Sequence, residues 1–320
     1  MIITGFQVLN WLGTKESIVK LQSWQSDPER YDFRHTLVPQ YSHMDTIRHV
    51  NNVAVHGMHL EARVRHQLAV LGQESLFSDD VLLRPQRTVT HFLRETHFPH
   101  DVLCTARLIA VERERYHVAT ALFQQGECVG VQQAWTGAWE HDGWTALPPA
   151  TYDALVAALS DTPAPIDDWP EKPLTQVDMS DYPVAAEISG RYADLDPDVV
   201  IGELAISRFA EQSRAGTLKP IRNDPALGLL VASVDLSYHR WRRGAAAAQV
   251  TCGVERIGNS SFALAGAVAV DSVRLASARS TMVLIDHAQR RPTPIDAPLR
   301  RAMEPLSIDT HAAQARMGES

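Results

Sequence analysis

The chain has 320 residues, of which 45% are hydrophobic and 21% charged, and it carries a formal net charge of −8 at pH 7. This length allows two domains of roughly 100–200 residues, each with its own core. The acidic balance argues against nucleic acid or an anionic membrane surface as the main partner.

The first half of the chain predicts one domain over residues 31–141, after a leader over residues 1–30. We expect a strand over Phe33–Tyr41, a helix over 51–71 and a loop over 73–86. The helix is indicated by apolar residues at three- and four-residue spacing and by Gly72 at the C-cap position. Four strands complete the domain, over Arg87–Glu95, Val102–Val111, Tyr116–Phe123 and Val129–Trp139. The apolar stripe of the helix is formed by Val53, Gly57, Leu60, Val64, Leu68 and Leu71.

Residues 142–183 are rich in Pro and Asp and predict a linker with a short helix over Tyr152–Leu159. A second domain over residues 184–286 then shows the same order of elements. We expect a strand over Val184–Gly190, a helix over Ile201–Leu218, and strands over Leu229–Tyr238, Ala245–Glu255, Ser261–Val270 and Leu275–Asp286. Residues 287–320 are polar and Pro-containing, and we expect a partly disordered tail.

The two domains match residue by residue. Tyr41, Asp45 and Arg63 recur 151 residues later as Tyr192, Asp196 and Arg214. The triplet that begins at Val111 recurs 143 residues later at Val254, which implies a longer loop in the first copy. The sequence therefore predicts an α+β protein in which two copies of one unit form a pseudo-dimer within the chain.

The cysteines and the hydropathy of the chain indicate where in the cell it is expected. Cys104, Cys128 and Cys252 show no CxxC spacing and cannot all pair, which favours a reduced, cytoplasmic location. Cys104 and Cys252 lie in apolar strand-like runs, so we expect core residues rather than nucleophiles. We see no signal peptide and no run of about 18 apolar residues, so we expect no membrane span.

A polar loop immediately before the first helix is the main candidate site. Asp45 stands just ahead of the helix start, whose N–H groups and partial positive charge suit a developing oxyanion. Asp45 is suited to act as a general base, as a nucleophile, or as a structural residue in an Asx turn. His49 fits either a group that orients water or a histidine that bridges loop and helix. Asn51 and Asn52 suit capping of the helix start.

Other polar residues have two interpretations each. Glu61 is suited either to act as a second acid in the site or to form a surface ion pair with Arg65. The basic cluster of Arg240, Arg242 and Arg243 fits phosphate binding or an exposed loop anchored by a tryptophan.

Three histidines on the first helix raise the question of a metal. His56, His59 and His66 follow one another on the helix, but the HExxH pattern is absent, so we expect no metal. We also expect no other cofactor, because neither a P-loop nor a GxGxxG sequence occurs.

The loop and helix together resemble the hot-dog thioesterases, in particular the 4-hydroxybenzoyl-CoA thioesterase-like and acyl-ACP thioesterase-like groups. The similarity is carried by Asp45, by His49-Val50-Asn51-Asn52, by Glu61-Ala62-Arg63 and by the phrase HFLRETHFPHDV. Two features depart from the family pattern. Arg48 replaces the usual glycine, and the tyrosine of the first helical turn is absent. The second copy keeps Asp196 but has Val200, Gly202 and Glu203 in place of His49, Asn51 and Asn52.

The resemblance implies two hot-dog domains in tandem, each an antiparallel sheet wrapped around one long helix. It also implies an acyl-thioester site at the seam between them and hydrolysis of an acyl-CoA or acyl-ACP substrate. The implied catalytic residues are Asp45, His49 and Asn52. The implied substrate-binding residues are Asn51, Val53, Glu61, Arg240, Arg242 and Arg243, with Asp196 marking a possible second site. Hot-dog sheets often assemble further, so we expect a homodimer of tandem chains.

Two other functions are compatible with the same residues. One is a hot-dog hydratase or dehydratase that acts on enoyl thioesters, which the HFP triplet at 97–99 superficially suggests. The other is an acyl-thioester binding protein without catalysis, which Arg48 and the degenerate second copy allow.

Overall fold

The computed structural model describes residues 21–76, 81–141, 143–162, 164, 174, 177–219, 227–286, 288–289 and 291–308. The first copy is built from one long helix and five strands. Its elements are β1 (Phe33–Leu37), α1 (Asn52–Leu71), β2 (Leu82–Phe92), β3 (Val102–Val111), β4 (Arg115–Gln124) and β5 (Glu127–Glu140).

The second copy repeats this order. Its elements are β7 (Val184–Ile188), α3 (Glu203–Leu218), β8 (Leu227–Tyr238), β9 (Ala248–Ile257), β10 (Ser261–Val270) and β11 (Val273–Asp286). Four shorter elements flank the two copies: β6 (Gly143–Thr145), α2 (Pro149–Ala158), β12 (Arg291–Pro292) and α4 (Ala297–Met303).

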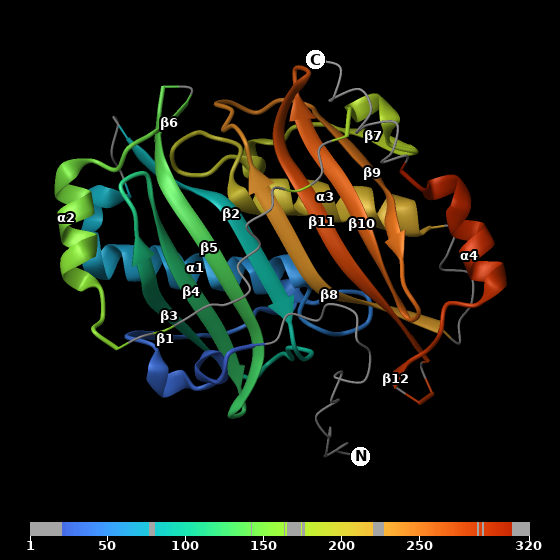
Figure 1. The fold of residues 1–320 in the computed structure, drawn as a ribbon, viewed down its shortest axis with the longest axis horizontal. Helices are drawn as coiled ribbons and strands as arrows, with labels where there is room; N and C mark the ends of the chain where they lie inside the picture. The colour runs from blue at the N-terminus through green and yellow to red at the C-terminus, as the bar shows by residue number, and fades with distance from the viewer. Residues whose placement is uncertain are drawn as a thin grey trace.

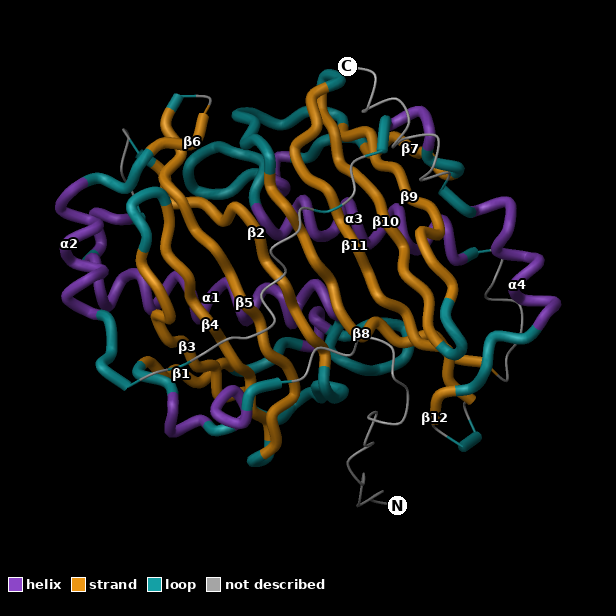
Figure 2. Tube along the Cα trace, viewed as in Figure 1, coloured by secondary structure: helices purple, strands orange, loops and turns teal. Residues whose placement is uncertain are grey.

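The strands form one continuous antiparallel sheet across both copies. Its order is β1-β3-β4-β5-β2-β8-β11-β10-β9-β7, so β2 and β8 meet at the centre and the two halves mirror each other. Both long helices lie against the same face of this sheet, and α2 and α4 lie at its two ends (Figures 1 and 2). The two-copy, α+β architecture predicted from the sequence is therefore confirmed.

The strand registers fix the relation between the copies. Leu108 pairs with Val118 in the first copy, and Val254 pairs with Leu264 in the second, a displacement of 146 residues. The β-bulge next to each pair recurs with the same displacement. The displacement of 143 residues proposed from the sequence is therefore wrong by three, because a short run of identical residues does not specify strand register. The first copy does have the longer loop between helix and sheet.

The buried face of α1 differs from the predicted apolar stripe. Val53 of that stripe is buried, but Leu60 and Val64 are only half-buried. The face that packs into the molecule carries Val55, Met58 and Ala62 together with polar residues, namely His56, His59, Arg63 and His66. A buried face with this composition must satisfy its polar groups within the protein. The seam described below does so for His56 and Arg63, whereas His59 Nε2 has no hydrogen-bond partner among the described residues.

An apolar cluster joins the two copies beside this polar face. Leu82 and Trp139 of the first copy pack with Ile206, Phe209 and Leu236 of the second. The seam is therefore a shared core rather than a contact between two finished domains.

Several element boundaries differ from the predictions. The first strand ends at Leu37, and β2 starts at Leu82 within the predicted loop and ends at Phe92. Residues 291–308 are folded rather than disordered, because Ile295, Met303 and Ile308 are buried against the second copy or its neighbouring segments. The predicted linker contains β6 and α2, whose Leu155 is buried in the core of the first copy. Most of the leader and the end of the tail lie outside the described residues.

The cysteines behave as core residues. Cys104 and Cys252 are buried, and all three thiols are free. Burial raises the pKa of the Cys104 thiol to about 12, so a thiolate nucleophile is disfavoured there.

Buried histidines make the stability of this fold depend on pH. Burial lowers the pKa of His66 to about 4 and that of His117 to about 3, against an ordinary value of 6.5. The unfolded chain therefore binds protons that the folded chain does not, and stability is full above pH 6.5 and falls as the pH drops toward these values. We expect a loss of about 1 kcal/mol per histidine between pH 7.5 and 5.5, measured by urea unfolding. An equal unfolding free energy at the two pH values would contradict this expectation.

Candidate functional site

The loop before α1 is organised by Asp45. Its Oδ1 accepts hydrogen bonds from the backbone N–H groups of Ile47, at 3.0 Å, and His49, at 3.1 Å. The Asp45 N–H donates to the His49 carbonyl at 2.8 Å. One carboxylate oxygen thus shapes the loop as in an Asx turn.

The backbone conformation at residue 48 explains why glycine is usual at this position in the family pattern. Arg48 has a φ of 67°, and Val199, which lies at the same place in the second copy, has a φ of 60°. Both are in the left-handed region, which glycine enters at least cost. The departure from the family pattern at Arg48 therefore leaves the loop shape intact.

His49 meets a carboxylate from the end of β2. The Val50 N–H donates to the Thr96 carbonyl at 2.8 Å and thereby holds the loop against the segment that follows β2. This places His49 Nε2 3.4 Å from Glu95 Oε2, with the His97 ring edge-on to the His49 ring at 5.2 Å. The side chains of His49 and Glu95 are 21% and 24% exposed, so water can reach them.

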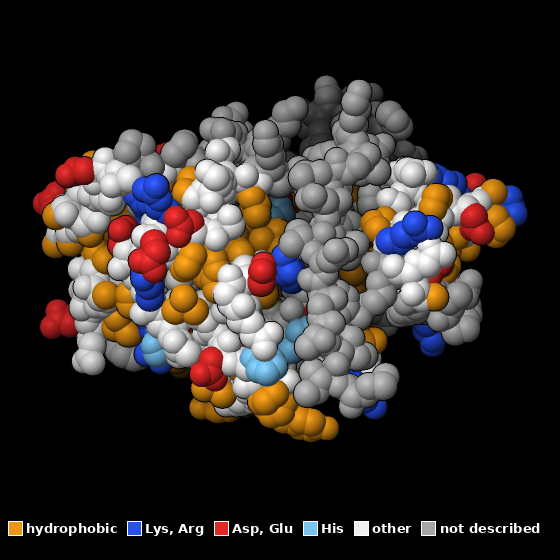
Figure 3. Space-filling model, turned by 90° about the horizontal axis from the view of Figure 1, so that it is seen from below, with side chains coloured by type: hydrophobic (Ala, Val, Ile, Leu, Met, Phe, Trp, Pro, Cys, Tyr) orange, Lys and Arg blue, Asp and Glu red, His pale blue; other side chains and the backbone are white. Residues whose placement is uncertain are grey.

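The surface around this loop is apolar and histidine-rich. Tyr41, Ile47 and Phe98 are exposed, and the Tyr41 ring contacts the Phe98 ring at 6.2 Å. Figure 3 views the molecule from below and shows hydrophobic, acidic and histidine side chains close together on the lower part of this face.

The start of α1 is tied to the second copy. Asn51 caps the helix, because its Oδ1 accepts the Val53 N–H at 2.7 Å. Its Nδ2 donates to Glu211 Oε1 on α3 at 2.9 Å. The capping role expected for Asn51 is confirmed, and its Oδ1 takes up the Val53 N–H, one of the helix-start N–H groups considered for a developing oxyanion.

A buried polar network crosses the seam further along α1, at His56 and Arg63. Arg63 donates to Glu203 Oε1 of α3 at 2.5 Å and to Gln132 Oε1 of β5 at 2.9 Å. His56 lies between the same partners, with Nε2 2.7 Å from Glu203 and Nδ1 3.1 Å from Gln132 Nε2.

The hydrogen bonds of this network fix its protonation. Since Arg63 can only donate, Gln132 must present its oxygen to Arg63 and its NH2 group to His56 Nδ1. His56 is therefore neutral and donates from Nε2 to an ionised Glu203. Burial raises the pKa of the Glu203 carboxyl, but Arg63 and His56 outweigh this effect and lower it to about 2. With both ring nitrogens engaged, His56 serves the seam rather than the chemistry of an exposed substrate.

The second loop has the same shape with different surroundings. Asp196 Oδ1 accepts the N–H groups of Asp198 and Val200, as Asp45 does in its own loop. Arg84 of β2 bridges this loop, at 2.5 Å from both Asp196 Oδ2 and Asp198 Oδ2. Both oxygens of Asp196 are thus engaged within the protein.

The basic cluster and Glu61 lie on the surface. Arg240, Arg242 and Arg243 are exposed, and Arg242 pairs with Asp271 at 2.9 Å. Trp241 beside them is buried, and its ring stacks on the Tyr238 ring with 5.1 Å between the ring centroids. This agrees with the interpretation of an exposed loop anchored by a tryptophan. Glu61 pairs with Arg65 at 2.6 Å on a half-exposed helix face.

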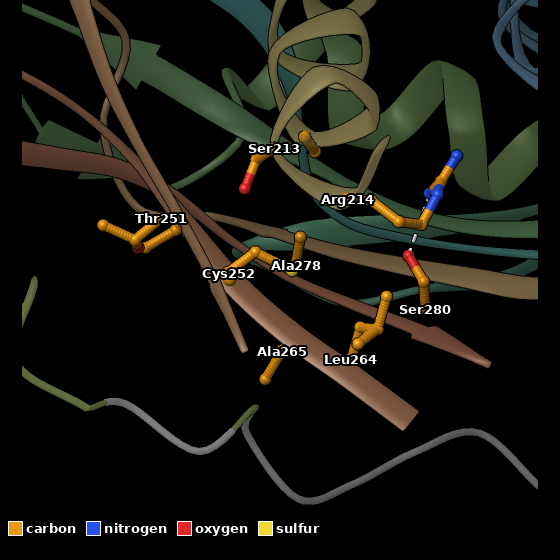
Figure 4. Close-up of a pocket in the computed structure, with 11 residues that line it drawn as sticks. Ser213, Arg214, Thr251, Cys252, Leu264, Ala265, Ala278 and Ser280 are labelled. Carbon is orange, nitrogen blue, oxygen red and sulfur yellow. Dashed lines mark hydrogen bonds between the residues drawn. The ribbon is translucent and has the colours of Figure 1, made fainter. Parts of the chain in front are cut away.

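Two small pockets lie beside the seam, and Arg214 lines both. One is enclosed by Asn52, Val53, His56, Phe92, Ser207, Arg214 and Val234 at the first turn of α1. The other lies between α3 and the sheet of the second copy, where Figure 4 shows Arg214, Ser280, Thr251 and Cys252 around it.

Metal binding finds no support in the three helical histidines. His56 is engaged as described, His59 Nδ1 bonds Thr120 Oγ1 at 2.8 Å, and the His66 ring packs edge-on to Phe33. Among the residues that the structure describes, no group of three or more His, Cys, Asp or Glu side chains could hold a metal ion.

Three residues of this region were not predicted from the sequence to be site residues: Glu95, Gln132 and Glu203. Glu95 lies within the family-like phrase HFLRETHFPHDV, which was the available signal. Gln132 and Glu203 carried no such signal, because their partners are 69 and 140 residues away.

The comparisons with known proteins agree with this architecture. No family model and no curated protein matches the chain. Among solved structures, a 12:0-ACP thioesterase from Umbellularia californica aligns with a TM-score of 0.67 at 15% identity, over 79% of this chain and 94% of that one. An acyl-ACP thioesterase from Bacteroides thetaiotaomicron aligns with a TM-score of 0.59 at 14% identity, over 79% of this chain and 97% of that one. The chain therefore has the tandem hot-dog fold.

The seam network gives a test by substitution. Glu203→Gln leaves the buried Arg63 guanidinium without a compensating charge, so we expect a loss of about 3–5 kcal/mol in unfolding free energy, measured by urea denaturation. The control is Glu29→Gln, which breaks an exposed pair with Arg34 and should cost less than about 1 kcal/mol. Equal losses in the two variants would show that the network does not hold the copies together.

Proposed function

We propose that this chain hydrolyses an acyl-CoA or acyl-ACP thioester to a free acid and a thiol. The observation that carries the proposal is the set of Asp45, His49 and Glu95 at the first turn of α1, in a tandem hot-dog fold. The second copy has Val200 at the position of His49 and Trp241 at that of Glu95. The proposed chemistry therefore belongs to the first copy alone.

Glu95 and His49 form the proton-transfer unit in this proposal. In this proposal the Glu95 carboxylate, 3.4 Å from His49 Nε2, favours a proton on that nitrogen, so that Nδ1 takes a proton from water. Asp45 keeps its loop closed through Oδ1 and acts through Oδ2, either on the attacking water or directly on the carbonyl carbon.

The start of α1 supplies the electrostatic part of the mechanism. The partial positive charge of a helix N-terminus stabilises the oxyanion that forms when the thioester carbonyl is attacked. Asn52 lies at this terminus and lines the adjoining pocket. Collapse of the intermediate breaks the carbon–sulfur bond, and the leaving thiolate takes the proton that His49 removed from water. Where Asp45 itself attacks, the thiolate takes its proton from water, and a second water then hydrolyses the acyl–Asp45 anhydride to the free acid.

The proposal also covers the location and the assembly of the chain. No helix within the described ranges is long and apolar enough to cross a membrane. We propose a cytoplasmic location from the cysteine usage and a homodimer of tandem chains from the resemblance to hot-dog proteins. Light scattering of the purified chain measures its mass directly.

Substitution of the two equivalent aspartates tests the proposal. We expect Asp45→Asn and Glu95→Gln each to lower kcat/KM on a panel of acyl-CoA and acyl-ACP substrates by about 10²-fold or more. Asp196→Asn is the matched control, since it changes the same loop of the second copy, and it should leave kcat/KM within about threefold. Free thiol release, followed with a chromogenic thiol reagent, gives the rates.

Three results would reject the assignment. Unchanged hydrolysis in Asp45→Asn would remove Asp45 from the chemistry. Tight acyl-CoA binding without turnover in the unmodified chain would favour a binding protein. Addition of water to crotonyl-CoA, without thiol release, would favour a hydratase.

A further inference from the structure

The carboxylate of Glu95 lies between two histidines. Its Oε2 is 3.4 Å from His49 Nε2 and 3.8 Å from His97 Nε2. The two imidazole rings meet edge-on, with 5.2 Å between their centroids. The His97 side chain is 44% exposed, against 21% for His49. His97 is therefore the member of this group that solvent protons reach most easily, and the proposed function has so far given it no role.

The backbone on both sides of His97 is held by the rest of the first copy. The Val50 N–H donates to the Thr96 carbonyl at 2.8 Å, which ties this segment to the loop before α1. The buried Gln124 of β4 accepts the His97 N–H and donates to the carbonyls of His97 and His100, each at 2.8 Å. The position of His97 beside Glu95 is therefore set by the loop before α1 and by the sheet.

The second copy keeps this backbone arrangement with other side chains. The Ile201 N–H donates to the Arg242 carbonyl at 2.9 Å, in the place of the bond between residues 50 and 96. The positions of His49, Glu95 and His97 are occupied by Val200, Trp241 and Arg243. The shared fold therefore does not require two histidines around a carboxylate. They occur together in the copy that carries the proposed chemistry.

The shared carboxylate couples the two rings electrostatically. Glu95 of the same segment and His49 of the loop before α1 face His97, while β4 presents the neutral Gln124. Asp45 adds a second carboxylate in the loop that carries His49. A proton on His97 compensates the charge of Glu95 and repels a proton on His49, so the two histidines titrate as a pair. His49 is the stronger base when His97 is neutral.

We propose that His97 is a positioning residue of the thioester-hydrolysing site, which acts through Glu95 on His49, and that the active form has both imidazoles neutral. This inference rests on the proposed thioester hydrolysis and adds a residue to its proton-transfer unit. With His97 neutral, the charge of Glu95 supports His49 as it takes a proton from water at Nδ1. That proton then goes to the leaving thiolate, so the step needs no further reactant.

The pH dependence of kcat/KM tests this inference with the full-length chain and an acyl-CoA that it hydrolyses, over the range in which circular dichroism shows the chain folded. We expect kcat/KM of the unmodified chain to fall with the square of the proton concentration on the acid side, because two rings must be neutral. His97→Gln leaves one such ring, so its kcat/KM should fall in simple proportion to the proton concentration. A residue that only supports the fold would not change this order.

His97→Arg tests the same inference with a permanent charge. Arg243 occupies this position in the second copy, so the shared backbone accommodates arginine. At pH 8 we expect kcat/KM of His97→Arg to lie at least about tenfold below that of His97→Gln, because a fixed cation compensates Glu95 at every pH. The control is His100→Gln, which changes an exposed histidine of the same turn and should keep the second-order fall of the unmodified chain.

The acid side of the unmodified chain decides the question even where a variant does not fold. A first-order fall in the unmodified chain would overturn the inference while leaving thioester hydrolysis in place. Equal kcat/KM in His97→Arg and His97→Gln would do the same. Absence of thiol release from any thioester in the panel would overturn the proposed function, and the inference with it.

Discussion

The contact between Arg63 of the first copy and Glu203 of the second is the interaction on which the rest of the structure depends. Two charges buried to this extent are tolerated only when each is paired and hydrogen-bonded, and Gln132 and His56 complete that requirement. The network holds α1, through His56 and Arg63, against the first turn of α3, which carries Glu203. Because the Asp45 loop leads directly into α1, its position at the seam follows from the same contact.

The two copies share a backbone and differ in what their side chains do. Each has an aspartate that closes a loop around a left-handed residue, and the bulges of the sheet recur in register. The first loop meets His49 and Glu95, whereas Arg84 closes the second. The polar network fills one side of the seam, while smaller residues leave space around Arg214 on the other. Duplication thus provides a frame in which one copy carries the proposed chemistry and the other supports it across the seam.

Local patterns predicted much of this architecture, and long-range contacts account for what they missed. The capping of α1 by Asn51 and the order of elements follow from neighbouring residues. The strand register did not, since the match of Val111 to Val254 is shifted by three residues from the equivalence that the strand pairing gives. The buried face of α1 was also mispredicted, because His56 and Arg63 are buried only in the presence of Glu203 and Gln132. Glu95 lies next to His49 because the Val50 N–H donates to the Thr96 carbonyl. The spacing of residues in the sequence does not predict this contact.

A crystal structure with a non-hydrolysable thioether analogue of an acyl-CoA tests the central claim most directly, since it shows which loop the reacting centre approaches. We expect the sulfur and the adjoining carbon within contact distance of Asp45 and His49, in the loop that leads into α1. An analogue bound at the Asp196 loop, with Arg84 displaced, would contradict it.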